Sequence, residues 1–163
     1  MKPTDTLTIL FSHHLWANLL LFEHCAALTD EQLAATIPGA YGSIYVTLQH
    51  IVTSEQSYFS RISTGQRYSR PEDAPPMTMA EMIDSLRTTG TGLIEWAPRV
   101  QADEIVIIDW DGTPRDVPKT IILTQVINHA TEHREQIKAI LTEIGIEPPD
   151  LQSWAYFDAV VDQ

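Results

Sequence analysis

Two histidines stand one helical turn apart near the carboxyl end of the chain, in a pattern that is otherwise apolar. His129 and His133 continue a stripe of branched aliphatic residues that recur at steps of three and four: Ile122, Val126, Ile137, Ile140 and Ile144. Positions i and i+4 of a helix differ by about 40° around its axis, and their Cβ atoms lie about 6 Å apart. Both rings can therefore reach one metal ion, which would give each inward-facing imidazole a partner.

The other histidines are the first candidates for a third ligand. His50 lies in an apolar segment of a predicted helix, residues 48–52. His14 shares a helical face with apolar neighbours, whereas His13 and His24 occupy other positions on the same predicted helix. The residue pattern does not choose between His50 and His14. A competing interpretation is a helical core that holds ordinary histidines and no metal.

Spacing excludes two familiar metal motifs. The zinc-protease motif requires Glu directly after the first His of the pair, and this chain has Ala130 there. Di-iron bundles use Glu-x-x-His, and none of the six histidines has an acidic residue three positions earlier. We therefore do not expect a carboxylate-bridged pair of metal ions.

Four segments with helical periodicity would position these histidines. The expected ranges are 6–28, 43–65, 78–97 and 118–145. Ser43 is a plausible cap for the second segment, and Thr78 with Glu81 forms a capping-box pattern at the start of the third. Gly and Pro close several of these segments.

A β-branched segment interrupts this helical pattern before the last helix. Residues 104–110 are followed by Asp111-Gly112, a strong signal for a two-residue hairpin turn. The sequence therefore predicts an all-α fold, a four-helix bundle with a small β-hairpin insertion before the last helix. We expect a single domain over residues 1–163.

Charge and cysteine content restrict the partners and the setting. The chain has 22 acidic and 10 basic side chains, a formal net charge of −12, which disfavours nucleic acid and anionic membranes as partners. No apolar run of about 18 residues could span a bilayer, and residues 1–5 lack a signal-peptide pattern. Cys25, the single cysteine, cannot form an intramolecular disulfide, so we expect a cytoplasmic protein.

Several short motifs, in this order and spacing, resemble the DinB-like family of four-helix metal-binding proteins over nearly the whole chain. They are Trp-Ala-Asn-Leu-Leu at 16–20, Leu-Gln-His-Ile at 48–51, the segment 128–137, and Gly145 with Pro-Pro-Asp at 148–150. The resemblance implies that His50, His129 and His133 bind one divalent ion, zinc or nickel. It also implies an up-down-down-up bundle, often a homodimer, and enzymes that use low-molecular-weight thiols.

Three neutral imidazoles would leave the ion its full charge and an open position, as in catalytic zinc sites. Such a site can lower the pKa of bound water toward about 7 or bind a thiol as thiolate. We therefore expect a metal-dependent thiol S-transferase or hydrolase that acts on a small-molecule substrate. The alternative is a non-catalytic, stress-associated metal-binding or dimerisation module, with Cys25 or His14 as a fourth ligand. Glu132, beside the histidine pair, is either a hydrogen-bond acceptor for a ligand or a solvated residue.

Overall fold

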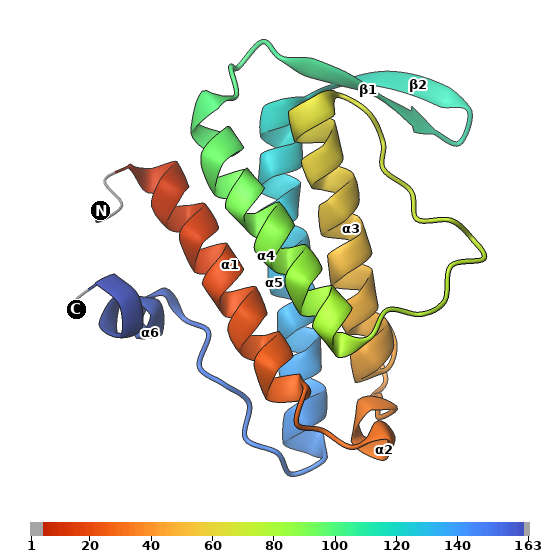
Figure 1. The fold of residues 1–163 in the computed structure, drawn as a ribbon, viewed down its shortest axis with the longest axis vertical. Helices are drawn as coiled ribbons and strands as arrows, with labels where there is room; N and C mark the ends of the chain where they lie inside the picture. Colours follow the sequence, from red (N-terminus) through yellow and green to blue (C-terminus); the bar gives the residue numbers. More distant parts are fainter. Residues whose placement is uncertain (1–4, 162–163) are drawn as a thin grey trace.

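Four long helices lie alongside one another and make up most of the molecule (Figure 1). The computed structural model describes residues 5–161. The helices are α1 (Thr6–Cys25), α3 (Ile44–Thr64), α4 (Met79–Trp96) and α5 (Lys119–Glu143). α4 packs between α1 and α3, and α5 packs mainly on α3 and also on α1. In Figure 1, α3 and α4 run in one direction and α1 and α5 in the other. The fold is therefore mainly helical, as expected.

Side chains cap the helices at the positions that their sequence predicts. Ser43 accepts a hydrogen bond from the backbone of Val46 at the start of α3, at 3.3 Å. Thr78 and Glu81 form a complete capping box at the start of α4. These bonds satisfy backbone N–H groups that have no partner within the helix. The predicted starts of α3 and α4 are thus confirmed.

The first helix ends earlier than its periodicity suggests. α1 stops at Cys25, and the next backbone bonds, from Ala27 to His24 and from Leu28 to Cys25, are those of a tighter turn. Thr29 then adopts an extended backbone as the N-cap of a short helix, α2 (Asp30–Leu33). Because a capping residue is not helical, α1 cannot continue through Thr29. The predicted end at residue 28 was wrong by one turn.

A two-stranded antiparallel sheet joins α4 to α5, as the sequence predicts. A 3₁₀ turn, η1 (Ala97–Arg99), leads into β1 (Ile105–Trp110), which pairs with β2 (Thr113–Pro118). Asp111 and Gly112 form the turn with φ of 51° and 79°, the left-handed region that an Asp-Gly pair tolerates. Figure 1 shows this hairpin beside the end of α3 and the start of α5.

Two glycines allow α4 to approach its neighbours closely. A Cβ atom on Gly90 would lie 2.6 Å from a methyl carbon of Leu15 on α1, and one on Gly92 would lie 2.3 Å from the ring of Phe59 on α3. Glycine weakens an isolated helix by about 1 kcal/mol relative to alanine. In α4 the loss of helix propensity is accompanied by tight packing on both sides.

The end of the chain returns to the outer side of α1. α6 (Ser153–Tyr156) and the π-helical turn η2 (Phe157–Val161) follow an extended segment that begins after α5. Tyr156 packs against Trp16 and His13 of α1. Within residues 5–161 we find no helix that has both the length and the apolar character of a membrane span.

Candidate metal centre

The structure brings His50, His129 and His133 together at the contact between α3 and α5. One ring nitrogen from each histidine can be chosen so that all three atoms lie within 4.8 Å of one another. The Nε2 atoms of His50 and His129 are 2.9 Å apart. Two imidazoles of α5 and one of α3 therefore face a common point, the arrangement that the helical spacing and the resemblance predicted.

Burial and the charge of neighbouring rings favour the neutral form of His50 and His129. The pKa of His129 is lowered to about 4, mainly by burial and also by the neighbouring rings of His133 and His50. The pKa of His50 is also lowered, first by burial and then by His133. A neutral imidazole has a nitrogen lone pair that can bind a metal ion. The cluster therefore offers nitrogen ligands at neutral pH without prior loss of protons from His50 or His129.

Gln136 fixes which nitrogen of His133 is available. The backbone N–H of Tyr41 can only donate, and it contacts Oε1 of Gln136 at 3.2 Å, so this atom is the amide oxygen. The same oxygen lies 3.0 Å from Nδ1 of His133, which must therefore donate to it. In a neutral ring, Nε2 of His133 then keeps its lone pair. This outer hydrogen bond is typical of metal-binding histidines.

Two tyrosines form walls around the cluster. The ring of Tyr41 stacks on His50, with centroids 4.0 Å apart and planes 16° apart, and its edge meets His133. Tyr58, on α3, meets the ring of His129 edge-on at 5.7 Å. Tyr41 is 52% exposed, so the cluster lies close to the molecular surface on that side.

Sequence reasoning missed these supporting residues. Gln136 stands one turn after His133 on α5, so helical spacing could have identified it. Tyr58 lies two turns beyond His50 on α3, where the sequence pattern indicates only a core aromatic residue. Tyr41 lies in the segment before α3, where no periodic pattern applies.

The rival ligands lie outside the cluster. His14 is only 1% exposed, and its Nε2 lies 2.8 Å from a carboxylate oxygen of Glu55. Cys25 is fully buried, and burial raises its pKa to about 12, so it is a thiol at neutral pH. Glu132 is exposed and accepts a hydrogen bond from Asn128 at 3.1 Å. Among the described residues, the histidine cluster thus has no fourth His, Cys, Asp or Glu close enough to share the ion.

A separate buried polar network contains His14. The carboxylate of Glu55 accepts hydrogen bonds from His14, Asn18 (3.1 Å) and Thr89. Arg134 donates to the amide oxygen of Asn18 at 2.7 Å. These residues connect α1, α3, α4 and α5 through buried bonds, although Nδ1 of His14 has no hydrogen-bond partner. Because Arg134 directly follows His133, the network also restrains the part of α5 that holds the cluster.

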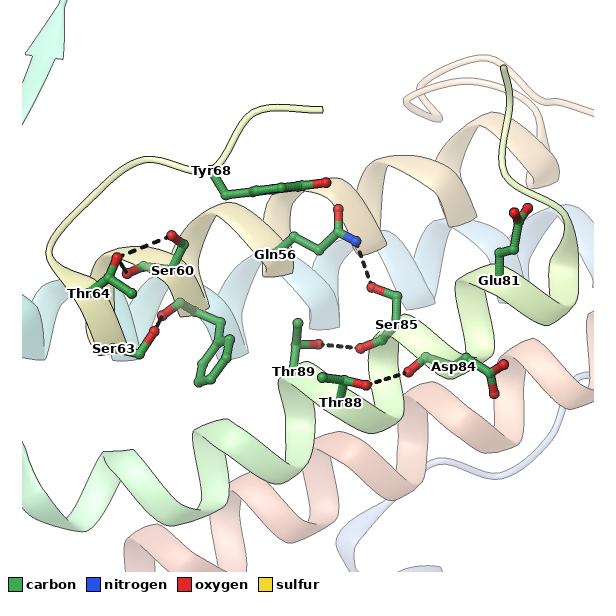
Figure 2. Close-up of a pocket in the computed structure, with 11 residues that line it drawn as sticks. Gln56, Ser60, Ser63, Thr64, Tyr68, Glu81, Asp84, Ser85, Thr88 and Thr89 are labelled. Carbon is green, nitrogen blue, oxygen red and sulfur yellow. Dashed lines mark hydrogen bonds between the residues drawn. The ribbon is translucent and has the colours of Figure 1, made fainter. Parts of the chain in front are cut away.

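A sizeable cavity lies away from the cluster. It has a volume of about 640 Å³ and lies between α3 and α4, lined mostly by hydroxyl, amide and carboxylate side chains (Figure 2). Gln56 donates to Ser85 across it at 2.8 Å. A second cavity, of about 540 Å³, lies along the face of α3 that carries His50 and includes Tyr58. Only this second cavity shares a residue with the walls of the cluster.

Comparisons with known proteins identify the family and support the fold. The model of the DinB family matches residues 2–159. Among solved structures, the chain is similar to a DinB-like protein from Bacillus cereus ATCC 10987, with a TM-score of 0.59 and 22% sequence identity. That alignment covers 85% of this chain and 91% of the other, and it supports the fold alone. No curated protein matches the chain.

Proposed function

This chain belongs to the DinB family, and from this membership we propose that it is a metal-dependent enzyme in which His50, His129 and His133 hold one divalent ion. The observation that carries the proposal is the cluster itself, whose three ring nitrogens lie within 4.8 Å without a fourth ligand among residues 5–161. An all-imidazole site suits zinc or nickel, and three protein ligands are typical of catalytic sites. The free Nε2 of His133 supports this fit.

The proposed reaction is thiol S-transfer or hydrolysis of a small-molecule substrate. When bound, such an ion acts as a Lewis acid that lowers the pKa of a thiol or water. Gln136 would hold the proton on Nδ1 of His133, and Tyr41 would shield one side of the ligand set from solvent. A low-molecular-weight thiol is the expected co-substrate of the transferase reaction.

We further propose that the chain folds as one domain over residues 1–163, a four-helix bundle of up-down-down-up topology. The directions of α1, α3, α4 and α5 in Figure 1 support this topology. A homodimer follows from the family resemblance, and a cytoplasmic setting from the single cysteine. Both stay predictions.

The alternative is a non-catalytic, stress-associated metal-binding or dimerisation module. It predicts a metal ion closed off by a fourth protein ligand, with Cys25 or His14 as the first candidates. Cys25 is fully buried outside the cluster, and His14 is bonded to Glu55. The open site therefore favours the enzyme.

A paired measurement of metal content and turnover tests the proposal. Protein loaded with zinc or nickel is analysed for bound metal and assayed with glutathione, bacillithiol and mycothiol against electrophiles, and against ester and amide substrates without thiol. We expect about one ion per chain. We also expect metal-dependent turnover either of a thiol with an electrophile or of an ester or amide substrate. One bound ion without any turnover would support the non-catalytic module, and no bound ion would contradict both functions.

A further inference from the structure

Three arginines line the cavity of about 540 Å³ on the metal-centre face of α3. They are Arg61, near the end of α3, and Arg67 and Arg70, in the segment between α3 and α4. The whole chain has 10 basic residues against 22 acidic ones, so three at one cavity are a marked local excess of positive charge. One carboxylate, Asp109 of β1, also lines the cavity.

The three arginines have little carboxylate partnership within residues 5–161: Glu81 lies near enough to Arg70 for the arginine charge to lower its pKa, but the two form no salt bridge. None of the three forms a salt bridge with a carboxylate in residues 5–161. Arg61 donates instead to the backbone oxygen of Ser57 at 3.2 Å and to its hydroxyl. Asp109 accepts a hydrogen bond from the turn residue Gly112 at 2.7 Å. Three arginines and one aspartate give the lining a formal charge of +2.

The other lining groups are suited to an oxyanion. Arginine guanidinium groups match the geometry of carboxylate and phosphate, and they bind these groups through paired hydrogen bonds. Hydroxyl side chains complete much of the wall: Thr53, Ser54, Ser57, Tyr58, Tyr68 and Ser69. The hydroxyl of Thr53 already donates to the backbone of α3, and the others can donate to a ligand. Ile108 contributes the apolar part of the lining.

The cavity and the histidine cluster are neighbours along α3. His50, Ser54, Ser57 and Arg61 lie within about 60° of one another around the helix, given 3.6 residues per turn. The guanidinium of Arg61 is bonded back to Ser57, which places positive charge about 10 Å along the axis from His50, at 1.5 Å per residue. Tyr58 lines the cavity and also contacts the ring of His129. A single extended ligand can therefore contact both places.

We propose that this cavity, which we call the arginine pocket, binds the carboxylate or phosphate group of a small-molecule ligand whose other end reaches His50, His129 and His133. The inference rests on the proposed function and narrows its substrate or co-substrate to an anionic molecule. The overall charge of −12 repels long polyanions such as nucleic acid, while a short anion gains the local attraction of the pocket.

A titration of the metal-free protein tests the pocket independently of the metal. Inorganic phosphate and succinate are added separately, and the Nε–Hε signals of the arginines are followed by NMR. We expect saturable shifts for Arg61, Arg67 and Arg70 but not for Arg99, an exposed arginine that does not line the cavity. The anion that saturates at lower concentration identifies the preferred group. Equal, unsaturated shifts of all arginines would overturn the inference.

Charge-neutral variants provide the matched control. The double variant Arg67→Gln/Arg70→Gln should weaken binding of the better anion by about tenfold or more, as expected for lost charge-assisted hydrogen bonds. Arg99→Gln removes a positive charge elsewhere and should leave this binding unchanged. Unchanged affinity in the double variant would also overturn the inference, and thermal unfolding confirms that both variants are folded.

A second titration tests the link to the histidine cluster. Zinc-loaded and metal-free protein are titrated with glutathione, which carries a thiol and two carboxylates, and with S-methylglutathione. We expect zinc to tighten glutathione binding by about tenfold or more, with a smaller gain for the methylated form. The double variant should bind as much zinc as the wild type but bind glutathione about tenfold more weakly. If the protein bound no zinc, the proposed function alone would be contradicted. If zinc did not change the affinity for glutathione, the proposal that one ligand contacts both the arginine pocket and the histidine cluster would be contradicted.

Discussion

Nδ1 of His133 donates a hydrogen bond to the side-chain oxygen of Gln136, 3.0 Å away on the next turn of α5. That oxygen also accepts the backbone N–H of Tyr41, whose ring stacks on His50. One amide group therefore sets the tautomer of a ligand on α5 and holds the loop that covers the ligand on α3. The histidine cluster depends on this group as well as on the three rings.

Removal of the Gln136 acceptor should weaken metal binding. Gln136→Leu has a similar volume but no oxygen, so His133 and the Tyr41 backbone both lose their partner. We expect metal affinity to fall about 10- to 100-fold, the usual cost of losing such an outer hydrogen bond. Gln136→Glu keeps an acceptor for both groups and should retain wild-type affinity or exceed it. Competition with a chelator measures both variants, and equal affinities of the Leu variant and the wild type would contradict the assignment.

Alanine at His50 and at His14 should have opposite effects. His50→Ala removes a proposed ligand, so most bound metal should be lost while the metal-free fold stays intact. His14→Ala leaves the Glu55 carboxylate buried without one of its partners, so the free energy of unfolding should fall by about 3 kcal/mol while metal content is retained. Elemental analysis and urea denaturation distinguish the two effects. Full metal content in His50→Ala would exclude this residue as a ligand.

Addition of a methyl group at Gly90 should destabilise the contact between α1 and α4. Alanine gains about 1 kcal/mol in helix propensity, but its Cβ would lie 3.1 Å from the Cβ of Leu15 as well as close to its methyl group. Overpacking typically costs about 1–3 kcal/mol, so we expect a net loss of about 1 kcal/mol. Thr91→Ala, at an exposed neighbouring position, should show no such loss. A more stable Gly90→Ala variant would show that Leu15 moves away without cost.

High pH should destabilise the protein through Cys25. The folded pKa is about 12, above the usual value of 9.0, so between these values the folded thiol keeps a proton that the unfolded chain releases. Stability contributed by this difference is present below pH 9 and decreases by about 1.4 kcal/mol per pH unit above it. Cys25→Ala should show a shallower decrease in denaturation experiments between pH 9 and 10.5. Rapid alkylation of native Cys25 at pH 8 would contradict its burial as a protonated thiol.

Local signals in the sequence determined much of this fold. The caps at Ser43 and Thr78, the Asp111-Gly112 turn and the aliphatic stripe of α5 depend on neighbouring residues, so they could be identified without the tertiary structure. The predicted end of α1, at residue 28, lies three residues beyond Cys25, where the helix stops, because the residues between Cys25 and Thr29 form a tighter turn before α2. The predicted aliphatic stripe of the last helix also included Ile144. In the structure this residue follows the last residue of α5 and is 36% exposed, so it lies outside the buried part of the stripe.

For the site, the sequence by itself determined that His129 and His133 share one face of a helix, because a separation of four residues fixes their geometry. It did not determine the third ligand, because the distance between two helices depends on how they pack. Only the tertiary structure placed His50 against the pair, paired His14 with Glu55, and brought Tyr41 and Gln136 together from positions 95 residues apart. The same packing of α3, the segment after it and β1 assembled Arg61, Arg67 and Arg70 around one cavity, which no helical period could have indicated.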